Sequence, residues 1–200
     1  MNKLYTEMHK ILKPCECPPY KLEYFDIDKK NFGAMLQGIS PGKYTRLMRG
    51  GEVIMSDTDM EKRTNREFVM NAYGDVLIGG LGIGLILMAI QEKEDIRTIT
   101  VLEKSKKVIK MIESQLPLNK KTKIIQADVF KWEPSEQVRF NTVYMDIWTC
   151  INQKIYYNEM LPLIEKYQQY LDSKDPNKLI TCWCEYELSL IHISEPTRPY

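Results

Sequence analysis

The stretch GDVLIGGLGIG, residues 74–84, runs from an apolar segment into a cluster of glycines. Residues 75–80 have the length and apolar character of a buried strand, and a helix is expected to begin at Ile83 or Gly84. Glycine-rich turns between a strand and a helix let the backbone approach a ligand closely, with amide groups available as donors. The stretch therefore predicts a strand, a ligand-binding turn and a helix.

Three nucleotide-binding glycine patterns can be compared with this stretch. A P-loop requires Lys followed by Ser or Thr after its last glycine, whereas Leu85 and Ile86 follow here. The dinucleotide fingerprint G-x-G-x-x-G/A fails at its last position, which is Leu85 when counted from Gly80. The pattern that fits is G-x-G-x-G at Gly80, Gly82 and Gly84, and a plain tight turn remains the alternative.

Downstream of the glycines, apolar runs alternate with helical stretches. The apolar runs are residues 98–103, 122–128, 141–146 and 178–184, and the helical stretches are residues 83–91, 105–116 and 152–170. This alternation is typical of a parallel sheet with helices on both faces. We therefore predict an α/β fold with a doubly wound, mostly parallel sheet over residues 71–187.

The first 70 residues have a different pattern. Short alternating runs at residues 21–27, 32–38, 43–49 and 52–56 are separated by turn signals, which predicts a small antiparallel β unit. Residues 56–72 are polar and helix-forming, with Ser56 or Asp57 as the expected N-cap. We expect residues 1–70 to form an N-terminal β appendage with one helix.

Three carboxylates stand at the ends of successive predicted strands. Glu103 lies nineteen residues beyond Gly84, and Asp128 and Asp146 end the next two apolar runs. Because parallel strands end at one edge of their sheet, all three should line the edge where open α/β folds bind ligands. An acid at the position of Glu103 can accept both ribose hydroxyls of an adenosine. A solvated turn or a helix cap is the alternative for each acid taken alone.

Composition narrows the function classes. The 200 residues carry 28 basic and 27 acidic side chains, a net charge of +1, so no global field favours nucleic-acid binding. The apolar run at residues 76–90 is too short for a membrane span, and the N-terminus shows no signal-peptide pattern. We expect a protein of the cytoplasm with no membrane segment.

The five cysteines do not predict a disulfide framework or a metal site. Their odd number fits a reducing compartment, and the two Cys-x-Cys pairs are spaced more closely than zinc knuckles. Cys182 and Cys184 stand in a strand-like run, so both should face the same side of a sheet. No metal is expected.

The chain resembles the class I S-adenosylmethionine-dependent methyltransferases over roughly residues 70–187. The resemblance rests on Gly79 to Gly84, Glu103, Ala127-Asp128 and Asp146, and within the superfamily it is nearest to the spermidine synthase branch. It implies a Rossmann-like methyltransferase fold with S-adenosylmethionine as cofactor. The cofactor-binding residues that it implies are Gly79, Gly80, Gly82, Gly84, Glu103, Asp128 and Val129. Of these, Gly80 and Gly82 would lie under the methionine moiety, Glu103 would bind the ribose, and Asp128 with Val129 would hold the adenine.

The acceptor is not identified by these residues and could be a small molecule or a macromolecule. Asp146 is the candidate for a catalytic base or an amine anchor, with Trp148 as a wall of the substrate site. A turn cap at Asp146 and simple packing of Trp148 are the alternatives. Aminopropyltransferases carry an Asp-Ser-Ser-Asp-type stretch here, and Thr149 replaces its second acid. The rival functions are aminopropyl transfer and a non-catalytic binding module, and the resemblance also makes a homo-oligomer plausible.

The last residues have a separate origin in this interpretation. LSLIHISEPTR, from Leu188 to Arg198, is similar to the in-frame translation of a transposase adapter used in sequencing libraries. We therefore expect residues 188–200 to be a non-native tail and exclude His192 from the catalytic candidates.

Overall fold

The structure is a computed structural model that describes residues 4–185. Its centre is a five-stranded sheet in the order β7-β6-β5-β8-β9, and every neighbouring pair is parallel. The strands are β5 (Gly74–Gly79), β6 (Ile96–Glu103), β7 (Thr122–Gln126), β8 (Thr142–Met145) and β9 (Leu179–Cys182). The predicted α/β fold class is confirmed, and each of the five expected strands is present. The expected tail at residues 188–200 lies outside the described residues.

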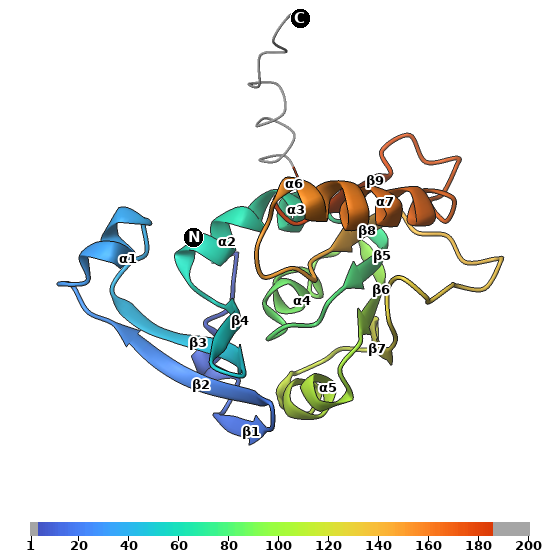
Figure 1. The fold of residues 1–200 in the computed structure, drawn as a ribbon. Helices are drawn as coiled ribbons and strands as arrows, with labels where there is room; N and C mark the ends of the chain where they lie inside the picture. Colours follow the sequence, from blue (N-terminus) through green and yellow to red (C-terminus); the bar gives the residue numbers. More distant parts are fainter. Residues whose placement is uncertain (1–3, 186–200) are drawn as a thin grey trace, which may run out of the picture.

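Helices cover both faces of this sheet, because alternate residues of each buried strand face opposite sides. Val76 and Ile78 of β5 belong to one core cluster, together with the helices α3 (Arg66–Asn71), α4 (Leu85–Ile90) and α5 (Lys106–Ile112). Leu77 belongs to the opposite cluster, which packs under α6 (Gln153–Ile155), a π-helical turn (Tyr156–Met160) and α7 (Leu161–Gln168). Figure 1 shows α6 and α7 on the side of the sheet away from α4 and α5.

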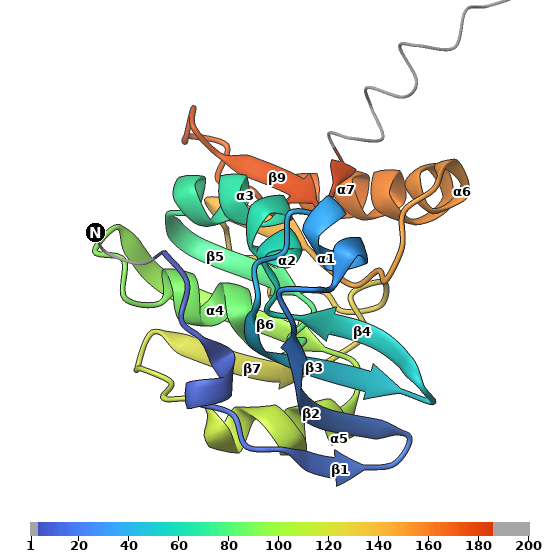
Figure 2. The same cartoon turned by 90° about the vertical axis from the view of Figure 1, so that its left-hand side faces the viewer.

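The N-terminal residues form a second, antiparallel sheet in the order β1-β2-β3-β4. Its strands are β1 (Cys15–Cys17), β2 (Tyr20–Ile27), β3 (Gly42–Arg49) and β4 (Glu52–Ser56). A 3-10 turn (Met8–Lys10) precedes it, and α2 (Asp59–Thr64) connects it to α3. Figures 1 and 2 show this sheet beside the parallel sheet, with β1 next to α5.

The two units share one core. Met8, Leu22 and Leu47 of the N-terminal unit belong to the same buried cluster as Val76 and Ile78 of β5. The buried Asp57 carboxylate accepts hydrogen bonds from the backbone amides of Met8 at 3.0 Å and Thr45 at 2.6 Å. Asp57 therefore connects the segment around Met8 to β3. The domain boundary expected at residue 70 remains a prediction based on sequence pattern.

Two expectations for the N-terminal unit are wrong. Residues 32–38 were expected as a strand, but Phe32–Leu36 form the helix α1, whose first turn is capped because the Asn31 side chain accepts from the amide of Ala34 at 3.0 Å. The expected helix at residues 56–72 is divided at Asn65 into α2 and α3. The N-cap of α2 is Thr58 and not Ser56 or Asp57, because Ser56 still belongs to β4 and Asp57 is buried against the sheet.

The expectation that Cys182 and Cys184 face the same side of a sheet is also wrong. Strand β9 ends at Cys182, and Cys184 has a φ of +53°, so the two cysteines do not follow one another on one strand face. Near the N-terminus, Cys15 and Cys17 lie in β1. This strand was not expected from the sequence, because prolines surround the segment. None of the helices between residues 4 and 185 has the length and apolar character needed to span a bilayer.

Candidate functional site

A cleft of about 620 Å³ lies at the carboxyl edge of the parallel sheet, against the N-terminal sheet. One wall consists of the ends of β5, β6 and β8 with the segments that follow them, and β4 with part of α2 forms the opposite wall. The predicted residues that line it are Gly80, Gly82, Glu103, Asp128, Val129, Asp146 and Trp148. The cleft therefore brings together residues that are spread over almost 70 positions of the chain.

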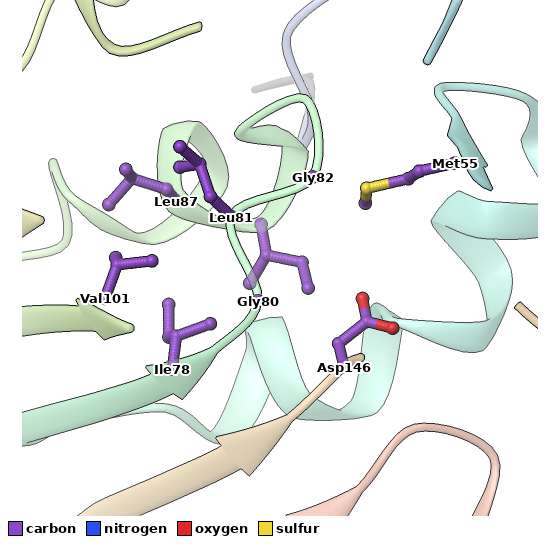
Figure 3. A pocket seen from close by; sticks show the side chains of 9 residues that line it. Met55, Ile78, Gly80, Leu81, Gly82, Leu87, Val101 and Asp146 are labelled. Carbon is purple, nitrogen blue, oxygen red and sulfur yellow. The ribbon is translucent and has the colours of Figure 1, made fainter. Parts of the chain in front are cut away.

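The glycine loop is held between two neighbouring strands. The amide of Gly80 donates to the carbonyl of Leu102 at 2.8 Å, and a Cβ on Gly80 would overlap the backbone carbonyl of Asp146. Gly80 has a φ of +99° and Gly82 a φ of +52°, conformations that favour glycine. Figure 3 shows Asp146 and Met55 on the same side of the loop, and Met55 of β4 approaches Gly82 so closely that a Cβ on Gly82 would overlap its sulfur.

Not every glycine of the motif reaches the cleft. A Cβ on Gly79 would meet Met145 and Val129, and a Cβ on Gly84 would meet Leu116. Neither glycine lines the cleft. Their roles in this structure are close packing and a left-handed turn, with Gly84 at a φ of +77° before α4.

Glu103 stands at the end of β6 with its carboxylate fixed by two backbone amides. Oε2 accepts from the amide of Leu81 at 3.1 Å, and Oε1 accepts from the amide of Ser105 at 2.7 Å. Burial raises the pKa of Glu103, and these amide hydrogen bonds act in the opposite direction. The side chain therefore connects the glycine loop to the start of α5.

Asp128 follows β7 and is engaged on both sides. Its carboxylate pairs with Lys104 Nζ at 3.0 Å and accepts from the amide of Phe130 at 3.1 Å. The hydrogen bond from Lys104 lowers the pKa of Asp128, against a smaller opposing effect of burial. Asp128 is thus a charged turn cap as well as a cleft residue, and Val129 beside it is buried.

Asp146 differs from these two acids because it has no compensating partner. Within residues 4–185, no side chain or backbone amide donates a hydrogen bond to its carboxylate and no cation pairs with it. Burial raises the pKa of Asp146 well above its usual range, and the nearby carboxyl of Glu61 raises it further. Burial also raises the pKa of Glu61, to about 7, although the amide of Ser56 opposes the shift.

Glu61 is a cleft residue that the sequence analysis missed. It lies in α2, a polar helix in which the glutamate has no local signal that separates it from solvent-exposed acids. Met55 and Trp183 also line the cleft without having been predicted. Trp148 is 8% exposed and its indole nitrogen donates to Glu159 at 2.8 Å, so it both packs and lines the cleft.

The raised pKa of Glu61 predicts a pH dependence of stability. Between its ordinary value of 4.5 and about 7, the folded chain retains a proton at Glu61 that the unfolded chain has released. The contribution of Glu61 to the free energy of unfolding should therefore fall as the pH rises through this window. We expect wild type to lose stability relative to Glu61→Gln between pH 4.5 and 7, as measured by urea unfolding.

The exposed Glu67 on α3 offers a matched control for this measurement. Glu67→Gln should keep a constant offset from wild type over the same pH range. Parallel profiles for Glu61→Gln and wild type would contradict the expected shift.

No protein-family model matches the chain, and no curated protein sequence matches it either. Solved structures do match. A spermidine synthase from Thermotoga maritima is 14% identical with a TM-score of 0.50, over 80% of this chain and 53% of that one. The N-methyltransferase NodS from Bradyrhizobium japonicum, solved with S-adenosyl-l-homocysteine, is 11% identical with a TM-score of 0.44, over 56% and 57%. The plantazolicin methyltransferase BpumL is 19% identical with a TM-score of 0.38, over 56% and 39%.

The chain thus spans less than two thirds of the length of each of these proteins. At such identities the likeness concerns the fold. The match to the spermidine synthase extends over most of this chain, and the parallel sheet order with helices on both faces agrees with it. The chain therefore has a Rossmann-like α/β fold similar to that of the spermidine synthase, preceded by an antiparallel N-terminal sheet.

Proposed function

We propose that the chain binds S-adenosylmethionine in the carboxyl-edge cleft and acts as a methyltransferase-like enzyme. One observation carries this proposal: the glycine loop and the three strand-end acids, which come from separate parts of the sequence, line a single cleft of about 620 Å³. A cavity of this size lies within the range of small-molecule sites. The edge of the sheet on which it opens is the one where open α/β folds bind ligands.

The residues present fit an adenosyl ligand. Each oxygen of Glu103 accepts one backbone amide, which leaves a lone pair on each for a ribose hydroxyl. Leu102, Val108 and Val129 line the cleft as apolar neighbours for an adenine ring. Asp128 would accept from the adenine amino group, and Gly80 with Gly82 would face the methionine moiety. When bound, S-adenosylmethionine supplies a methyl group on a positively charged sulfur.

The work of the chain's own residues would be positioning and proton transfer. Asp146 lines the cleft, and its raised pKa makes the carboxylate a stronger base than an exposed aspartate. We assign to Asp146 the role of the base that removes a proton from the methyl acceptor. Trp148, held by its hydrogen bond to Glu159, would form a wall that excludes water from the same region.

Calorimetric titration of the full chain tests this function. We expect S-adenosylmethionine and its demethylated product, S-adenosylhomocysteine, to bind, and both to bind more tightly than decarboxylated S-adenosylmethionine. A preference for the decarboxylated compound would contradict methyl transfer and support aminopropyl transfer. A folded chain that binds none of the three would contradict the nucleoside site and leave a non-catalytic module as the better account.

A further inference from the structure

The large apolar side chains most exposed to solvent between residues 4 and 185 gather on one short helix, α1. They are Leu36 at 82%, Phe32 at 71% and Met35 at 60%, ahead of Met70 of α3 at 56%. Their spacing of i, i+3 and i+4 places them on one face of α1, and the buried Ala34 lies on the opposite face. Figure 1 shows α1 at the left-hand margin of the molecule, with the parallel sheet on the opposite side. Apolar groups that gather in this way mark an interaction surface.

The orientation of α1 is fixed at both of its ends. At the first turn, the Asn31 side chain accepts from the amide of Ala34. Just beyond the last turn, the Arg63 guanidinium of α2 donates to the carbonyls of Gln37 at 2.6 Å and Gly38 at 2.8 Å. Ala34 belongs to a small buried cluster between α1 and the N-terminal sheet. The fold therefore holds α1 so that its apolar face is directed to solvent.

Cations without acidic partners flank this apolar face. Residues 29–43 contain Lys29, Lys30 and Lys43 but no acidic residue. Lys29 and Lys30 are exposed directly before the helix, and neither forms an ion pair within the part of the chain that the structure describes. The nearest acid in sequence, Asp28, uses one carboxylate oxygen to accept the backbone amide of Lys30 at 3.0 Å. An apolar helix face beside free lysines is the combination that binds an anionic lipid surface.

A second copy of the chain fits this surface less well. Packing of α1 on α1 would bring Lys29 and Lys30 of both copies together, and like charges repel. Three side chains also fall short of the roughly 800 Å² per partner that a stable protein interface buries. A lipid surface has neither difficulty, because its phosphates complement the lysines and its interface receives a protruding apolar group without a matching groove.

We propose that α1 is a docking element for an anionic lipid bilayer. Phe32, Met35 and Leu36 enter the interfacial region, and Lys29, Lys30 and Lys43 contact the anionic headgroups. This is contact with a membrane surface and not a span. The inference goes beyond the proposed function, which concerns the cleft, and its test needs no nucleoside.

Sedimentation of the full chain with lipid vesicles tests the proposal. One set of vesicles is an equal mixture of phosphatidylcholine and phosphatidylserine, and the other is phosphatidylcholine alone. The apolar contact is tested by Met35→Ser, with Met70→Ser as the matched exposed methionine on α3. The charge contact is tested by Lys30→Glu, with Lys120→Glu as the matched exposed lysine outside α1. Circular dichroism checks that each variant is folded.

We expect the chain to bind the mixed vesicles, with affinity that falls as salt is added, and to bind phosphatidylcholine much more weakly. Met35→Ser and Lys30→Glu should each weaken binding to the mixed vesicles about tenfold, whereas Met70→Ser and Lys120→Glu should bind as wild type does. Absence of binding, equal binding to both vesicles, or equal effects of a variant and its control would overturn the proposal. A dimer in analytical ultracentrifugation that Met35→Ser abolishes would instead assign the face to a second copy.

Discussion

Glu103→Ala should weaken binding of S-adenosylmethionine and S-adenosylhomocysteine by roughly a hundredfold or more, since two hydrogen bonds from ribose to a carboxylate are lost. The truncation also leaves the amides of Leu81 and Ser105 without their acceptor, at about 1–3 kcal/mol of stability. Calorimetry measures the affinity, and urea unfolding measures the stability.

Two further variants make this result specific. Glu103→Gln keeps one carbonyl acceptor and should lose less affinity than Glu103→Ala. Glu94→Ala removes an exposed glutamate in the loop before β6 and should bind as wild type does. Equal affinities of Glu103→Ala and Glu94→Ala would contradict the assignment of Glu103 to the ribose. Glu103 is a cleaner probe than Gly82, where a valine would be strained by the positive φ and would overlap Met55.

Gly80→Ala should destabilise the fold by about 3 kcal/mol or more, the sum of backbone strain and overpacking. The new methyl group would overlap the backbone carbonyl of Asp146, which cannot rotate away as a side chain could. The loop cannot retreat either, because the Gly80 amide is bonded to Leu102 on the other side. Since Gly80 would face the methionine moiety, the affinity for S-adenosylmethionine should drop together with stability.

Gly51→Ala provides the control for conformational strain alone. Gly51 has a φ of +92°, close to the +99° of Gly80, and a Cβ there would meet no heavy atom within 4 Å. We expect Gly51→Ala to cost about 1 kcal/mol and to leave nucleoside binding unchanged. Urea unfolding of both variants gives the difference, and equal losses would show that the approach of Gly80 to Asp146 is not tight.

The short apolar runs at residues 32–38 and 43–49 show where local pattern stops being informative. Both runs are brief and mixed, so periodicity alone does not separate helix from strand. Residues 43–49 pair with β2 along their whole length, whereas Phe32–Leu36 have no strand partner and are capped by Asn31. Whether each run forms a helix or a strand therefore depends on pairing partners that are distant in sequence.

The amino-acid sequence by itself determined the α/β sheet, the glycine turn and the positions of Glu103, Asp128 and Asp146, because these depend on local features. Buried strands are read from continuous apolar runs, and parallel strands necessarily bring their carboxyl ends to one edge. Only the tertiary structure decided that Glu61 joins Asp146, since α2 reaches the cleft through the docking of the N-terminal sheet on β5. It likewise decided their raised pKa values, because desolvation depends on atoms brought together from the whole chain and not on neighbours in sequence.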